Sequence, residues 1–327
     1  MVIGDCRTLT AHQSPITPQK WKMDPILSAF LSSWDWRVEL IIVLALAGII
    51  YTRGWWRLRK RTAARRGLNR RQAGARWRPF VYIGGLVILG LALMSPIDVI
   101  GSQLFFMHMI QHILLMTIVP PMLWLANPLP FFLWGLPGNV RKEVGRLLGR
   151  QGKGRLALQK VAGPGTVWIA YVVFYLGWHD RMLYNAALER EFVHDLEHIS
   201  FFGVAMLYWW HVIGAGPVVH RPLSIIGRFV FLLMAIPPNM IAGMAIAFSQ
   251  SPIYPHYEAM PRIWGLTVMS DQRLAGVIMW VPGSMMYIVA ALIALARWLK
   301  EEEEKPALPE SEWASDEAFI APGLEKR

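Results

Sequence analysis

Apolar residues are concentrated in seven long runs, separated by shorter polar segments. A helix needs about 20 residues to cross the hydrocarbon layer of a bilayer, and only helices or closed barrels satisfy their backbone hydrogen bonds there. The pattern predicts an all-α, polytopic membrane protein built as a seven-helix transmembrane bundle. The predicted spans are residues 38–53, 79–96, 103–126, 165–178, 196–213, 226–249 and 275–299.

Positive charge alternates between the segments that join these runs. Residues 53–78 contain eleven Lys and Arg and no acid, and residues 127–164 contain seven bases and one acid. Residues 179–195 and 250–274 have two bases each, with at least as many acids. Because cytoplasmic loops of membrane proteins are enriched in Lys and Arg, we expect the N-terminus outside and the C-terminus in the cytoplasm.

The composition supports a membrane protein and excludes several functions. The chain is 54% hydrophobic and 17% charged, whereas soluble domains are about 25% charged. The net charge is +11, but most bases lie in short loops between apolar runs, so no nucleic acid is expected as a partner. A single cysteine, Cys6, excludes an internal disulfide and any Cys-x-x-Cys site.

Three regions follow from the distribution of apolar and charged residues. Residues 1–37 are expected to be extracytoplasmic, without a visible signal peptide, and Pro25 to Trp36 could form a short helix on the outer membrane interface. Residues 38–299 form the membrane domain. Residues 300–327 are predicted to be an acidic, disordered cytoplasmic tail, because residues 301–327 hold nine of the 22 acids.

Histidines gather at the predicted outer end of the bundle. His108 and His112 are four positions apart, and His194 and His198 repeat that spacing, which places each pair on one helix face. Ionisable residues inside a membrane are candidates for function. Each ring could instead be neutral and hydrogen-bonded to a neighbouring helix, but two such pairs at one end favour a metal site.

Imidazole suits copper, zinc and iron, and thioether sulfur selects Cu(I) among them. The predicted copper site consists of His108, His112 and His198, with His194 or Met279 as a further ligand and Asp271 nearby. Met279 could also simply fill space in the core. Asp271 could orient an imidazole or pair with Arg273.

Several blocks of sequence lie in or beside these spans: His108 to His112 followed by Pro120-Pro121, Glu197-His198, Trp209-Trp210, Ile253 to Tyr257, and above all Asp271 to Trp280. Together they resemble the CtaG family, the multi-spanning assembly factors of bacterial caa-type cytochrome c oxidases. The resemblance covers about residues 38 to 299. It implies a non-enzymatic protein of the bacterial plasma (inner) membrane that handles copper on the outer side. The implied partners are cytochrome c oxidase subunits and an extracytoplasmic copper chaperone, in contact with the lipid bilayer.

Two other functions use similar residues. A haem-binding electron carrier needs two imidazoles on opposite helices, for which His112 and His198 are candidates. A metal-ion transporter needs a polar path to the inner face, and only Asn239 and His211 suggest one. We therefore rank a copper-handling assembly factor first, a haem carrier second and a transporter third.

Overall fold

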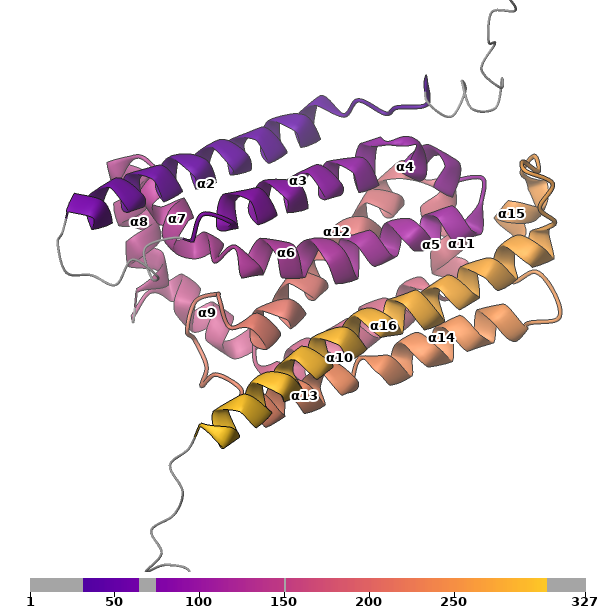
Figure 1. The fold of residues 1–327 in the computed structure, drawn as a ribbon. Coiled ribbons are helices and arrows are strands. Elements are labelled where there is room, and N and C mark those ends of the chain that lie inside the picture. The colour runs from indigo at the N-terminus through magenta and orange to yellow at the C-terminus, as the bar shows by residue number, and fades with distance from the viewer. Residues whose placement is uncertain (1–31, 65–74, 150, 305–327) are drawn as a thin grey trace, which may run out of the picture.

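A computed structural model describes residues 32–64, 75–149 and 151–304 of the 327-residue chain (Figure 1). Within these ranges every regular element is helical, as the hydrophobic pattern predicts. The predicted interfacial helix at Pro25 to Trp36 lies mostly outside the described residues, and of its described part, residues 32–36, residues 33–36 are not helical. Cys6 and the predicted tail beyond Glu304 also lie outside them.

All seven predicted apolar runs are helical, although their ends differ from the prediction. In chain order they are α2 (Val38–Ala64), α3 (Arg78–Met94), α5 (Phe105–Ile113) continued by η1 (Leu114–Ile118) and α6 (Val119–Leu125), α10 (Pro164–Trp178), α12 (Glu191–Ile213), α13 (Ile225–Leu233) with α14 (Ile236–Phe248), and α16 (Val268–Glu303). Helix α2 extends well past residue 53, where Arg59 and Lys60 stack over the rings of Trp55 and Trp56.

Length and composition support fewer membrane spans than seven. Within the described residues, four helices are long and apolar enough to cross a membrane, and a fifth is added if α9 (Lys153–Val161) and α10, which meet at a bend of 65°, form one broken span. Helix α3 has only 17 residues. Helix α12 begins with a polar stretch that includes Glu191, Asp195 and Glu197. The number seven therefore remains a prediction.

The shorter helices lie at opposite ends of the bundle. Figure 1 places α7 (Pro128–Gly135), α8 (Gly138–Leu148) and α9 at one end, and α4 (Pro96–Gly101), α11 (Arg181–Glu189) and α15 (Pro255–Ala259) at the other. The first end includes the basic helices α8 and α9. The connecting segments rich in Lys and Arg and those with few bases therefore lie at opposite ends of the bundle.

Close helix contacts at glycine fix parts of the bundle. A Cβ atom on Gly276 of α16 would lie 2.5 Å from the backbone nitrogen of Ala247 in α14, so only glycine permits this approach. Helices α2 and α7 meet in the same way, because a Cβ on Gly135 would collide with the carbonyl oxygen of Ile50. Between these contacts runs the helix of α5, η1 and α6, which contributes Met109 to one hydrophobic cluster and Leu115 to another.

A π-helical turn, η1, interrupts this helix between the predicted histidine ligands and Pro120-Pro121. The N–H of Val119 donates to the carbonyl of Leu114, five residues back. Pro120 has no N–H to offer the preceding turn, and the carbonyl of Met116 instead accepts a 2.9 Å hydrogen bond from the indole of Trp209. The carbonyl of Met116 thus keeps a hydrogen-bond partner although Pro120 cannot donate to it, and the indole joins this helix to α12.

Candidate metal centre

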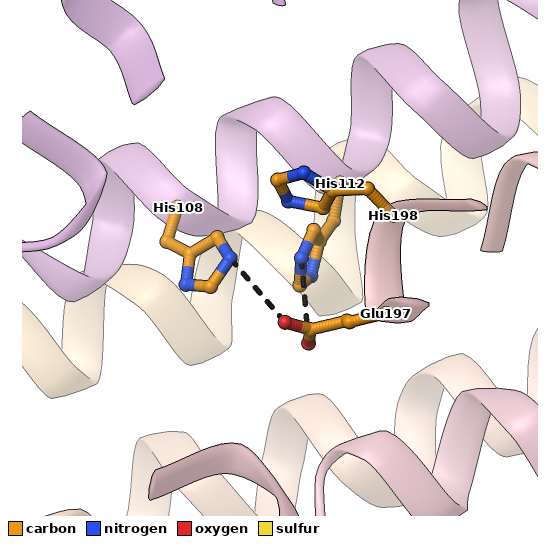
Figure 2. A group of neighbouring side chains, drawn as sticks. All are labelled: His108, His112, Glu197 and His198. Atoms are coloured by element: carbon orange, nitrogen blue, oxygen red, sulfur yellow. Dashed lines mark ion pairs between the residues drawn. The ribbon is translucent and has the colours of Figure 1, made fainter. Parts of the chain in front are cut away.

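Helices α5 and α12 bring together four side chains that can bind a metal. His108 and His112 extend from α5, and Glu197 and His198 from α12, with one ligand atom of each residue within 4.8 Å of those of the others (Figure 2). The ring centres of His108 and His112 are 4.3 Å apart, and both lie within 5.8 Å of His198. We call these four residues the histidine–glutamate cluster.

Most polar atoms of this cluster have no hydrogen-bond partner among the described residues. These atoms are Nε2 of His108, both ring nitrogens of His112, Nε2 of His198 and both carboxylate oxygens of Glu197. Nε2 of His112 lies 3.6 Å from Oε1 of Glu197, and Nε2 of His108 lies 3.9 Å from Oε2. Those separations are too long for hydrogen bonds. Two ligands of one tetrahedral ion lie about 3.3 Å apart when each bond is ~2 Å, so small movements would allow a shared ion.

Glu197 is the member that the sequence prediction missed as a ligand. Its side chain is 0% exposed, and a buried carboxylate without partners is costly unless it coordinates a metal or pairs with a cation. The signal was present in the sequence, because an acid within the predicted span 196–213 is itself a candidate functional residue. Its negative charge could compensate part of the charge of an ion held by the three imidazoles.

A chain of hydroxyl groups sets the tautomer of His108. The hydroxyl of Tyr257 donates to the carbonyl of Gly101 at 3.0 Å, and it lies 3.0 Å from the hydroxyl of Tyr184, which is 2.6 Å from Nδ1 of His108. Each hydroxyl carries one proton, so Tyr184 donates to Tyr257 and the Nδ1–H of His108 donates to Tyr184. The neutral ring therefore presents the lone pair of Nε2 towards Glu197, as a metal ligand must.

His179, at the end of α10, adds another neutral imidazole beside the cluster. Its Nδ1 donates to the carbonyl of Tyr175 at 2.6 Å, and its buried Nε2 has no partner among the described residues. Burial lowers the pKa of His179 to about 4, against a smaller opposing effect of that hydrogen bond. Its ring centre lies 6.1 Å from that of His112.

Met279, a predicted further ligand, lines a small cavity next to the cluster. The cavity has a volume of about 20 Å³ and is also lined by His112, His179, Met109 and Met116. A space of that size holds about one water molecule. The structure thus places Met279 beside His112, together with two other thioethers.

His194, the other predicted further ligand, belongs to a second group. It lies one turn before His198 on α12, and these two residues and Asp98 of α4 have ligand atoms within 4.8 Å of one another. Asp98 was not predicted, because nothing in the sequence indicates that α4 reaches the start of α12. Burial raises the pKa of Asp98 to about 6, although a 2.6 Å hydrogen bond from the Gln111 amide partly offsets this effect.

Asp271, for which the sequence left open orienting an imidazole or pairing with Arg273, holds the start of α5. Its carboxylate accepts hydrogen bonds from the backbone N–H groups of Phe105 and Phe106 at 3.0 and 2.9 Å. These are the first residues of α5, whose own N-cap residue, Leu104, has no polar side chain to cap them. Its cation partner is Arg262, at 3.4 Å, rather than the predicted Arg273. Asp271 therefore positions the helix that carries His108 and His112.

The chain belongs to the cytochrome c oxidase caa3 assembly factor (Caa3_CtaG) family, whose pattern it matches over residues 49–301. Among curated proteins it is similar to an uncharacterised protein of Mycobacterium leprae, with 23% identity over 284 residues covering 85% of this chain and 41% of the relative. An uncharacterised protein of Mycobacterium bovis is 25% identical over 299 residues, covering 86% of this chain and 42% of the relative. The chain thus spans about two fifths of the length of these relatives. No solved structure matches it.

Proposed function

We propose that this assembly factor binds a copper ion in the histidine–glutamate cluster and delivers it to a haem-copper cytochrome c oxidase. The observation that carries the proposal is the set of unpaired nitrogen and oxygen atoms of His108, His112, Glu197 and His198, buried within reach of one another. Copper is the cargo, so binding must be reversible. The protein's own part is to hold the ion and release it, without catalysing a reaction.

The donor atoms support copper over other metals. For a given set of nitrogen and oxygen ligands, divalent copper binds more tightly than the other first-row divalent ions. Three imidazoles with one carboxylate suit Cu(II), and the thioethers of Met109, Met116 and Met279 around the adjoining cavity suit Cu(I). The histidine–glutamate cluster and the adjoining cavity can therefore accept copper as Cu(II) or as Cu(I).

The proposal includes an orientation in the bacterial plasma membrane. We place the histidine end outside, the basic end with α8 and α9 in the cytoplasm, and seven spans over residues 38–299. Residues 1–37 are then extracytoplasmic and residues 300–327 cytoplasmic. The outer end would face the oxidase subunits that receive copper and an extracytoplasmic chaperone that supplies it. Labelling of single cysteines in intact cells with an impermeant reagent should reach residues 181–189 of α11 and not α8.

The space beside His112 argues against the haem-carrier alternative, although the ring centres of His112 and His198 are only 5.6 Å apart. The cavity beside His112, at about 20 Å³, has no room for a porphyrin. A transporter would need further polar groups between the cluster and the basic end, where the side chains of Asn239 and His211 bond to backbone carbonyls.

The test is the metal content of detergent-purified protein after loading with copper and washing with a weak chelator. Wild-type protein should retain about one copper per chain, and His112→Ala should lose it, because two unpaired nitrogens of the cluster disappear. His256→Ala is the matched control, since this ring bonds to the carbonyl of Ser102 and lies outside both ligand groups. Wild-type protein that retains zinc or iron, or no metal, in place of copper would refute the proposal.

A further inference from the structure

The second ligand group, Asp98, His194 and His198, is placed where an incoming ion would arrive first. Asp98 and His194 are partly exposed, whereas all four residues of the histidine–glutamate cluster are buried. Helix α4, which carries Asp98, lies at the histidine end of the bundle (Figure 1). We call Asp98, His194 and His198 the shallow group.

His198 is common to both groups. Its ring centre lies 4.1 Å from that of His194 and within 5.8 Å of those of His108 and His112. Its Nε2 is buried and has no hydrogen-bond partner among the described residues. A neutral imidazole has a lone pair on one of its two nitrogens, so the ring of His198 cannot bind an ion in each group at once. The two groups therefore share one ion.

The surroundings of Asp98 hold its carboxylate in place and leave it able to bind. Gln111, next to His112 on α5, donates from its amide to Oδ1 of Asp98 at 2.6 Å and to the carbonyl of Ala92 at 2.8 Å. An ionised carboxylate has about four lone-pair positions, so this bond does not exhaust it. One amide thus links the carboxylate of the shallow group to the helix that bears His108 and His112.

Asp195, the other acid beside His194, is already paired. Both of its oxygens accept hydrogen bonds from the guanidinium of Arg37, each at 2.6 Å. This two-point ion pair removes Asp195 as a free ligand. Asp98 is therefore the carboxylate available to an ion that has reached His194.

We propose that copper binds first to Asp98, His194 and His198 and is then passed to the histidine–glutamate cluster, with His198 bound to it throughout. The inference rests on the proposed copper function and adds a loading site and an order of binding to it. During transfer, the bonds from copper to Asp98 and His194 break, and bonds to His108, His112 and Glu197 form. Copper keeps its charge and no electron moves. Asp98 compensates part of the copper charge before transfer, and Glu197 does so after it.

The experiment measures Cu(II) loading from its glycine complex into purified, full-length protein, by stopped-flow absorbance for the rate and electron paramagnetic resonance for the final site. Asp98→Asn keeps an acceptor for Gln111 and removes the charged ligand. It should load about 10- to 100-fold more slowly than wild type, yet reach the same stoichiometry and the same final spectrum. His194→Ala should behave in the same way. Glu191→Gln, which alters an exposed acid on the first turn of α12, is the control and should load at the wild-type rate.

Variants of the other group identify the intermediate. His112→Ala should stop Cu(II) in the shallow group, where it is held weakly and gives a spectrum with fewer nitrogen ligands. His198→Ala should bind at neither group. Wild-type loading rates in both Asp98→Asn and His194→Ala would overturn the loading site while copper binding stands. Failure of wild-type protein to bind copper would overturn the proposed function as well.

Discussion

The histidine–glutamate cluster contrasts with a second buried polar group in the same bundle, the tyrosine cluster of Tyr171, Tyr208 and Tyr287. The hydroxyls of Tyr171 and Tyr287 bond to each other at 2.8 Å, and that of Tyr208 donates to the carbonyl of Phe231. Each hydroxyl therefore has a partner from the protein itself. In the histidine–glutamate cluster, four nitrogens and two oxygens have none among the described residues.

That difference separates the groups that stabilise the bundle from the groups that we propose bind copper. A satisfied buried hydrogen bond contributes about 0.5–1.5 kcal/mol to stability, whereas an unsatisfied buried polar group costs about 1–3 kcal/mol. The tyrosine cluster should therefore matter for folding and not for copper. The histidine–glutamate cluster should matter for copper and contribute nothing to the stability of the metal-free protein.

The largest contrast is expected for Glu197→Gln. Removing the charged ligand should weaken copper binding by at least about 100-fold, which exceeds the loss usual for groups that only support a ligand. The metal-free variant should unfold no more easily than wild type, because a buried carboxylate without partners disappears. Competition with a copper chelator measures the first effect, and thermal unfolding in detergent the second. If Glu197→Gln lost stability and kept its copper affinity, Glu197 would serve the fold and not copper binding.

Copper itself should stabilise the protein, mainly through the histidine–glutamate cluster. A ligand that binds only the folded state adds about 2.7 kcal/mol at a concentration of 100 times its dissociation constant. The unfolding temperature of wild type and of Tyr287→Phe should therefore rise with copper and fall again after chelation. That of Glu197→Gln should rise much less under the same conditions. An equal rise in Glu197→Gln would place the ion elsewhere.

Asp271→Ala should lower both the stability of the protein and its copper affinity, because Asp271 caps the helix that carries His108 and His112. Loss of the cap at Phe105 and Phe106 should cost about 0.5–2 kcal/mol of stability. Copper affinity should also fall, since α5 positions His108 and His112, while the spectrum of the bound Cu(II) keeps the same number of nitrogen ligands. Asp271→Asn, which retains an acceptor for one N–H, should recover part of both losses. Wild-type copper affinity in Asp271→Ala would instead show that this cap does not position the two histidines.

Tyr287→Phe should show the smallest effect and the opposite pattern. It removes the hydroxyl that bonds to Tyr171 and leaves the packed ring in place, so it should cost about 1 kcal/mol. Copper content after chelator washing should equal that of wild type. A copper deficit in this variant would show that the two clusters are coupled.

The sequence predicts the parts of the site that depend on helical periodicity. His108, His112 and His198 follow from their spacing within apolar runs, and the structure brings them together. Glu197 could have been predicted by applying the same rule to acids as to histidines. Asp98 could not, because its place depends on the packing of α4 against α5. The role of Asp271 was also hidden, since its partners are backbone groups more than 160 residues away along the chain.

The fold shows the same division between local and tertiary information. All seven apolar runs are helical, since hydrophobic length alone determines that outcome. The number of membrane spans does not follow from the same pattern, because α3 is short and α12 begins with acids. The π-helical turn at Leu114 to Ile118 was not predicted, because it depends on a partner for the carbonyl that Pro120 leaves free, and that partner, Trp209, comes from another helix.

That π-helical turn also constrains how the gene can change. A π-helical turn holds one residue more than an α-helical turn. Deleting one codon between Leu114 and Ile118 would therefore restore an ordinary α-helix and leave Trp124, which donates to the carbonyl of Met206 at 2.8 Å, facing α12. Deleting one codon between Val119 and Trp124 would instead rotate Trp124 by about 100° relative to His108 and His112. In-frame deletions beyond the turn should therefore be selected against more strongly than deletions within it.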